Sequence, residues 1–179
     1  MWDRAKAIEA IVYLAGRINS PTKMKIFKIL YLADKLHMSR YGRFIIGDNY
    51  VAMQHGPVPS KTYAIVKQVE NGSYSDAFAV PTTRQITPLR PPNLRDLSES
   101  DIECFEETLR EHGRKTAKQL RDITHGDAWN RVSNRGEIFS EGSSSSQSVP
   151  IPLEFIVDEL PNAAAVRELL QIEGYLPLK

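Results

Sequence analysis

Apolar positions are denser between Lys23 and Pro59 than anywhere else in the chain. From Ser20-Pro21 to about Met38 they occupy nearly every side of a helical projection, and a helix that is apolar nearly all round is a buried one. Ser20 is placed to cap this helix, with Pro21 in its first turn. We expect the ammonium groups of four lysines to extend outward from it: Lys23, Lys25, Lys28 and Lys35.

Short β-like runs follow this helix. The Tyr41-Gly42 pair ends it, and residues 43–46 and 50–54 then have strand-like patterns. Residues 56–59 form an extended corner, since each proline biases the preceding residue away from a helix. Residues 84–89 alternate weakly and can add an edge strand. These runs predict a small antiparallel sheet.

Helical periodicity dominates the rest of the chain. Asp3 is placed to cap a first helix, and Ser98 with Asp101 forms a capping box before another. Further helices are predicted over 58–70, 116–124, 153–160 and 162–173, with a brief helical piece at 127–132. The predicted fold is α+β and mainly α, with a central buried helix, surrounding helices and an antiparallel sheet of two or three strands. We expect one domain over 1–179, comprising a core at 1–139, a flexible Ser-rich loop at 140–149 and a helical extension at 150–179.

Composition adds that this is an ordinary globular chain. It has 179 residues, 41% of them hydrophobic and 25% charged, and one cysteine, which excludes an intrachain disulfide framework and suits a reducing compartment. No signal peptide or membrane span is recognisable, so we expect a cytoplasmic protein without membrane contact. The net charge of +1 is uneven, with +6 over residues 1–70 and −5 over 71–179.

No catalytic, metal or phosphate-binding motif is present, and we expect neither an enzyme nor a cofactor. Asp34 and His37 lie three residues apart on the central helix, which favours a hydrogen-bonded pair over an acid–base couple. Cys104 lies among glutamates that disfavour a thiolate. Those glutamates indicate a solvated helix face: Glu103, Glu106, Glu107 and Glu111.

Two motifs resemble those of the Panacea domain, the SocA-like antitoxin family of bacterial and phage toxin–antitoxin operons. The first is a Lys-rich apolar helix with a Leu-x-Tyr-x-Ala run, then Tyr-Gly, then Gly-Pro-Val; the second is a Thr-His pair followed by a tryptophan. The motif residues, expected to be structural, are Lys25, Tyr31, Asp34, Gly42, His55, Gly56, Pro57, Val58, His125 and Trp129. One departure is Met53-Gln54-His55, where the family often carries Trp-Lys-Tyr.

The resemblance implies a non-enzymatic antitoxin that binds a cognate protein toxin encoded beside it. One family member instead delivers its toxin to a protease. Exposed aromatic and arginine side chains dominate interface energies, so we expect the partner surface where the helix gives way to strands: Arg40, Tyr41, Arg43, Phe44 and Tyr50. The C-terminal tail is a second candidate, and the sequence leaves the oligomeric state open.

The alternative is a winged-helix-like transcriptional regulator, with residues 43–54 as the wing. The lysines of the central helix could then contact phosphates and give weak DNA binding, which positions a protein without reading sequence. A recognition helix, however, exposes polar residues to base edges, and this helix is too apolar for that.

Overall fold

The computed structural model describes residues 2–81, 84–139 and 147–177. Over these residues the chain forms eight α-helices, two 3-10 helices and five short strands, which confirms the mainly α, α+β class. The helices are α1 (Arg4–Ala15), α2 (Lys23–Tyr41), α3 (Ser60–Glu70), η1 (Leu94–Asp96), α4 (Glu99–His112), α5 (Ala117–Thr124), α6 (Asp127–Ser133), η2 (Glu137–Phe139), α7 (Leu153–Asp158) and α8 (Ala163–Ile172). The strands are β1 (Tyr50–Met53), β2 (Gly56–Pro59), β3 (Phe78–Ala79), β4 (Thr87–Pro88) and β5 (Val149–Pro150).

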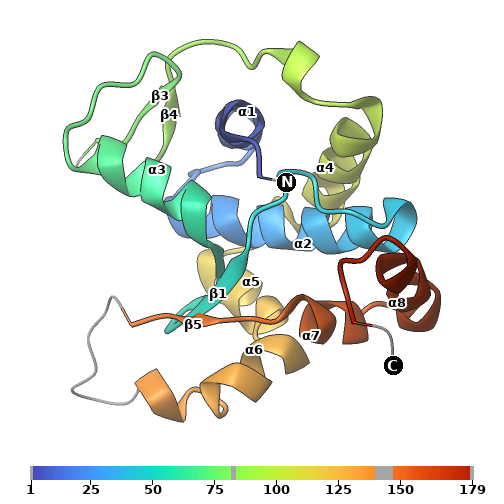
Figure 1. Cartoon of the computed structure of the whole chain (residues 1–179). Helices are drawn as coiled ribbons and strands as arrows, with labels where there is room; N and C mark the ends of the chain where they lie inside the picture. The colour runs from blue at the N-terminus through green and yellow to red at the C-terminus, as the bar shows by residue number, and fades with distance from the viewer. Residues whose placement is uncertain (1, 82–83, 140–146, 178–179) are drawn as a thin grey trace.

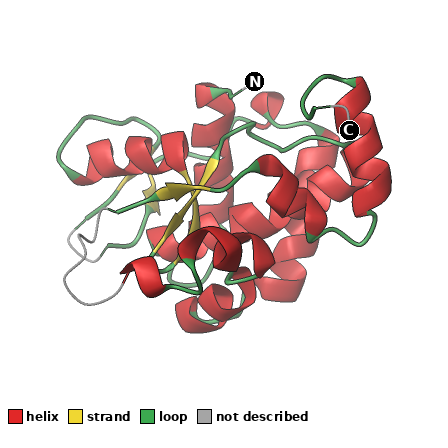
Figure 2. Ribbon diagram, turned by 60° about the horizontal axis from the view of Figure 1, so that its bottom comes forward, coloured by secondary structure: helices red, strands yellow, loops and turns green. Residues whose placement is uncertain are grey.

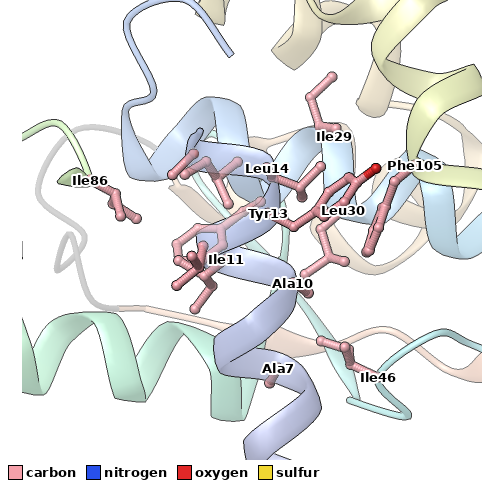
Figure 3. Packing of buried hydrophobic residues seen from close by; sticks show 14 of the residues in the cluster. Ala7, Ala10, Ile11, Tyr13, Leu14, Ile29, Leu30, Ile46, Ile86 and Phe105 are labelled. Carbon is pink, nitrogen blue, oxygen red and sulfur yellow. The ribbon is translucent and has the colours of Figure 1, made fainter. Parts of the chain in front are cut away.

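Helix α2 is the central element, as its all-round apolar pattern predicts. It crosses the middle of the molecule, with α1 on one side and α5 and α6 on the other (Figure 1). Each of the three apolar clusters among the described residues includes an α2 side chain, such as Leu30, Tyr31 or Met38. The largest cluster joins α1, α2 and α4, where Ile11, Leu30 and neighbouring side chains interlock (Figure 3).

The predicted start of α2 is wrong by two residues. Thr22, not Ser20, is the N-cap, and its hydroxyl accepts the Lys25 N–H. Ser20 has a φ of 52° and belongs to the preceding turn, while Thr22 also forms a β-bridge with Gln85. The start of α2 is therefore fixed in part by Gln85, a residue more than 60 positions away in the sequence. The C-terminal end of the helix is set locally, because Gly42 adopts a left-handed φ of 69°, the usual way to end a helix.

The sheets differ from the predicted one. The larger has the order β2-β1-β5 (Figure 2), with Tyr50 opposite Pro59 and Val51 opposite both Val58 and Pro150. The predicted corner at 56–59 is therefore an edge strand, where prolines are tolerated. Residues 84–89 were predicted to join this sheet, but β4 pairs instead with β3 in a separate two-stranded sheet.

Residues 43–46 are not a strand, which corrects a further prediction. Their backbone groups find other partners: the Ile45 N–H donates to the Asp34 carboxylate at 2.6 Å, and the Ile46 carbonyl accepts from the Asp3 N–H at 3.3 Å. Both isoleucines are buried. The run of apolar residues at 44–46 was interpreted as a strand, although it lacks the alternation of polar and apolar residues that marks one.

The predicted N-caps are confirmed at two helices, α1 and α4. The Asp3 carboxylate accepts from two N–H groups at the start of α1, and Ser98 with Asp101 forms the expected capping box of α4. Most of the predicted Ser-rich loop, 140–146, lies outside the described residues. Its predicted end is wrong, because Val149 pairs with Ala52 as part of β5.

Candidate functional site

The buried side chain of Asp34 anchors the segment that follows α2. This segment, residues 42–50, passes over the C-terminal half of α2. The buried Asp34 carboxylate accepts the Ile45 N–H and the Tyr50 hydroxyl, both at 2.6 Å. Burial raises the pKa of Asp34 to about 7, although the hydrogen bonds from Tyr50 and Ile45 oppose the rise. The carboxylate is thus a structural anchor for the segment.

His37 anchors the same segment separately, so the predicted Asp34–His37 hydrogen bond is wrong. The Nδ1 atom of His37 lies 2.9 Å from the Arg43 carbonyl, and its Nε2 atom lies 3.2 Å from Asp101 Oδ1. Lys6 also reaches Asp101, at 2.5 Å. Burial alone would raise the pKa of Asp101, but the hydrogen bonds from His37 and Lys6 outweigh it and hold this pKa well below its ordinary range.

On the outside, Arg40 and Tyr41 contact α4. Arg40 donates to Glu107 at 2.8 Å and to Glu103 at 2.9 Å, and the Tyr41 hydroxyl donates to Glu103 at 2.9 Å. Glu103 and Glu107 on this exposed face therefore accept hydrogen bonds from neighbouring side chains, and Glu106 likewise accepts from Tyr13 and Arg17. Arg40 is committed within the chain.

Arg43 and Phe44 border a cleft of about 510 Å³ beside the 42–50 segment. Tyr50, predicted to be exposed with them, is only 1% exposed. Its ring packs edge-on against Tyr31 and Phe44, so the expected exposure of Tyr50 is wrong. The cleft is lined by Asp3, Lys6, Met38, Gly42, Arg43, Phe44, Ile45, Gly47, Asp48, Asn49, Tyr50, Ile151, Leu153, Ile156, Leu170 and Tyr175.

The Gly-Pro-Val motif meets α2 at Lys28. Lys28 was expected to extend outward, yet it is 1% exposed and donates to the Pro57 carbonyl at 2.6 Å. Burial lowers its pKa to about 7. Gly56 has a φ of 103°, and a Cβ there would lie 2.9 Å from the Lys28 ammonium and 3.1 Å from the His125 ring. The positive φ and the crowding therefore favour glycine at this position.

The second motif packs on the same hairpin. The His125 ring stacks on Trp129 with centroids 3.7 Å apart, and the Trp129 indole N–H donates to the Met53 carbonyl at 3.0 Å. Burial, with the positive charge of Lys28, lowers the pKa of His125 to about 4. His55 itself is exposed in the hairpin turn, and Val58 is buried against the main core.

Glu159, which no sequence pattern singled out, joins the C-terminal extension to these motifs. Its carboxylate accepts the Ala128 N–H at 2.6 Å near the start of α6, and it pairs with Lys35 at 2.6 Å and with the Tyr31 hydroxyl at 3.4 Å. The sequence places Glu159 inside the helix predicted over 153–160 and gives no sign of its distant partners, so this role was not predictable.

The lysines of α2 are all engaged within the chain. Lys23 pairs with Glu70 at 2.7 Å, Lys25 donates to the Asn19 carbonyl at 2.7 Å, and Lys28 and Lys35 have the partners given above. Helix α2 is also packed against α1, α4 and α5. This arrangement gives α2 neither the exposure nor the free charge of a recognition helix.

Two further kinds of site considered from the sequence are a reactive cysteine and a metal centre. Cys104 is buried, and burial raises the pKa of its thiol to about 11. Within 2–81, 84–139 and 147–177, no three His, Cys, Asp or Glu side chains gather in a way that could hold a metal ion. No helix of that described part is long and apolar enough to cross a membrane.

Comparison with known families identifies the chain. Residues 26–130 match the model of the SocA-like antitoxin family, Panacea domain. The match covers more than half of the chain, and the chain therefore belongs to this family, as the two motifs indicated, and has the antitoxin role that defines the family in general. No curated protein and no solved structure matches it.

Proposed function

We propose that this protein neutralises a cognate protein toxin by binding it directly, without catalysis, in the cytoplasm. The observation that carries the proposal is the family match over residues 26–130, which contains both α2 and the 42–50 segment. The exposed side chains of Tyr41 and Arg43, next to a cleft, supply the aromatic and arginine groups that dominate interface energies. The buried motif residues support that surface rather than contact the toxin.

The 1–179 chain acts in this proposal as one unit, because the extension outside the family match packs on α2 through Met38, Val157 and Leu170. The docking surface is the rim of the 42–50 segment. Arg40 and Tyr41 are held there by α4, and Arg43 and Phe44 face the cleft.

Co-expression with each neighbouring gene tests the proposal. We expect one neighbour to arrest growth, this chain to restore it, and the two proteins to co-purify. A shortened toxin half-life after translation is blocked would indicate delivery to a protease instead of simple sequestration. Growth arrest that this chain does not relieve, with no complex from either neighbour, would show the proposal to be wrong.

A further inference from the structure

The cleft beside the 42–50 segment has two walls of different origin. One wall, including Arg43, Phe44 and Tyr50, lies inside the 26–130 family match. The other, including Leu153 and Tyr175, belongs to the C-terminal extension outside it. Figure 1 shows the chain after α2 running next to this C-terminal segment. The cleft thus combines residues inside the family match with residues outside it.

The lining of the cleft suits apolar side chains. Its volume of about 510 Å³ lies within the range of mostly apolar sites that enclose a ligand. Leu170 and Ile156 are buried beneath it, whereas Tyr175 at its edge is 64% exposed. An exposed aromatic ring beside an apolar hollow is a typical anchor for a protein partner.

Charge narrows the chemistry of that partner. Four ionised side chains line the described cleft: Asp3, Lys6, Arg43 and Asp48. Asp3 caps α1, Asp48 accepts the Thr62 N–H and hydroxyl at 2.8 and 2.7 Å at the start of α3, and Lys6 pairs with Asp101. These three are committed to the fold.

Arg43 is different. Its side chain is 48% exposed, and the contacts of its guanidinium with the described residues are all long: 3.4 Å to the Phe44 carbonyl and 3.5 Å to Ser98, Ser100 and Asp101. The Asp101 carboxylate already contacts Lys6 and His37 at shorter distances than Arg43. A guanidinium presents a rigid fork of N–H donors that matches a carboxylate. Arg43 is thus the lining charge with unused donor capacity.

We propose that the cleft receives an apolar segment of the toxin that carries a carboxylate, and that this carboxylate pairs with Arg43. The inference rests on the proposed toxin-binding function and adds the chemistry of the contact. The family wall supplies the charge, and Tyr175 with the rest of the extension supplies the apolar wall. The extension therefore selects which toxin fits.

Two cleft variants with matched controls test this inference. The probe is the neighbouring gene product that the wild-type chain suppresses, purified in an inactivated form. Arg43→Glu and Tyr175→Asp should each raise its Kd by about tenfold or more. The controls are Arg114→Glu, exposed beyond the far end of α4, and Tyr74→Asp, which is 92% exposed on another loop. Both controls should leave the Kd unchanged.

A second measurement separates a lost contact from a folding defect. Arg43→Glu places a carboxylate near Asp101, so Arg43→Gln is tested beside it and should weaken binding less. A toxin variant with one acidic residue changed to arginine should restore binding to Arg43→Glu and not to Tyr175→Asp. That rescue requires a folded protein and a direct charge contact.

Three results would overturn the inference. If wild type binds the toxin and both cleft variants keep the wild-type Kd, the inference is wrong while the proposed function stands. If Tyr175→Asp converts a dimer to a monomer and leaves toxin affinity intact, the cleft is a contact between two copies. If wild type neither relieves growth arrest nor binds either neighbour, the proposed function fails and the inference fails with it.

Discussion

Helix α2 buries Lys28 in its first half and Asp34 in its second half, and the two side chains differ in how many hydrogen bonds compensate for their burial. Asp34 accepts two hydrogen bonds of 2.6 Å, from Ile45 and Tyr50. Lys28 donates one hydrogen bond of 2.6 Å, to the Pro57 carbonyl, in the described part of the chain. Each group ties α2 to a segment that follows it, the 42–50 segment in one case and β2 in the other.

The difference shows what each anchor depends on. A carboxylate that accepts from a backbone N–H and a hydroxyl fixes both donors, which would otherwise be buried without acceptors. An ammonium has three donors, and one carbonyl leaves it poorly compensated for its lost hydration. Burial therefore shifts both pKa values to about 7, but only Asp34 has hydrogen bonds that oppose the shift. Asp34 anchors the 42–50 segment by hydrogen bonds, whereas Lys28 stabilises the contact with β2 largely through packing.

Asp34→Ala should have the largest effect. It leaves the Ile45 N–H and the Tyr50 hydroxyl buried without acceptors, and removing one side of such a network costs about 3–5 kcal/mol. Urea unfolding at pH 7 measures the loss of unfolding free energy. Asp34→Asn retains an acceptor for Ile45 and should lose less, and Asp127→Ala, on an exposed residue, serves as the control. A loss as small as that of Asp127→Ala would mean that Asp34 is not an anchor.

Gly56→Ala should come second, with a loss of about 2–3 kcal/mol. The new Cβ would lie 2.9 Å from the buried Lys28 ammonium, and the φ of 103° is strained for any residue but glycine. Gly72→Ala separates the two causes, since Gly72 has a φ of 97° and open space around it. Thermal or urea unfolding of both variants gives the crowding cost as the difference. Equal losses would show that Lys28 does not crowd this position.

The sequence could predict the features that depend on local pattern. The all-round apolar character of α2 identified the central helix, and side-chain caps identified the starts of α1 and α4. It could not predict which distant group would satisfy a given atom. Ile45 was assigned to a strand because its partner, the Asp34 side chain, is not part of any strand pattern.

The candidate site was predictable to a similar extent. The motifs located the 42–50 segment, and Arg43 and Phe44 do border the cleft. Tyr50 was placed on the outside because an aromatic residue after a turn has no marker of burial. The C-terminal extension is held by Glu159, which contacts Tyr31 and Lys35 of α2 more than 100 residues earlier. No local pattern encodes such contacts.

Lys28 should give the smallest effect, visible as a pH dependence. Its pKa falls from an ordinary 10.5 to about 7 on folding, so between pH 7 and pH 8.5 the unfolded chain holds a proton that the folded chain has lost. The Lys28 contribution to stability therefore rises with pH in this window, by about 1–2 kcal/mol. Asp34, whose pKa is raised to about 7 on folding, opposes this rise only weakly, because most of its folded-state proton is lost above pH 7. Urea unfolding at both pH values measures the slope. Lys28→Met keeps most of the buried volume without the titrating group and should flatten it, while Lys118→Met, on an exposed residue, should not. A wild-type stability that is flat or falls from pH 7 to pH 8.5 would contradict a largely neutral Lys28 and would remove the difference drawn between the two halves of α2.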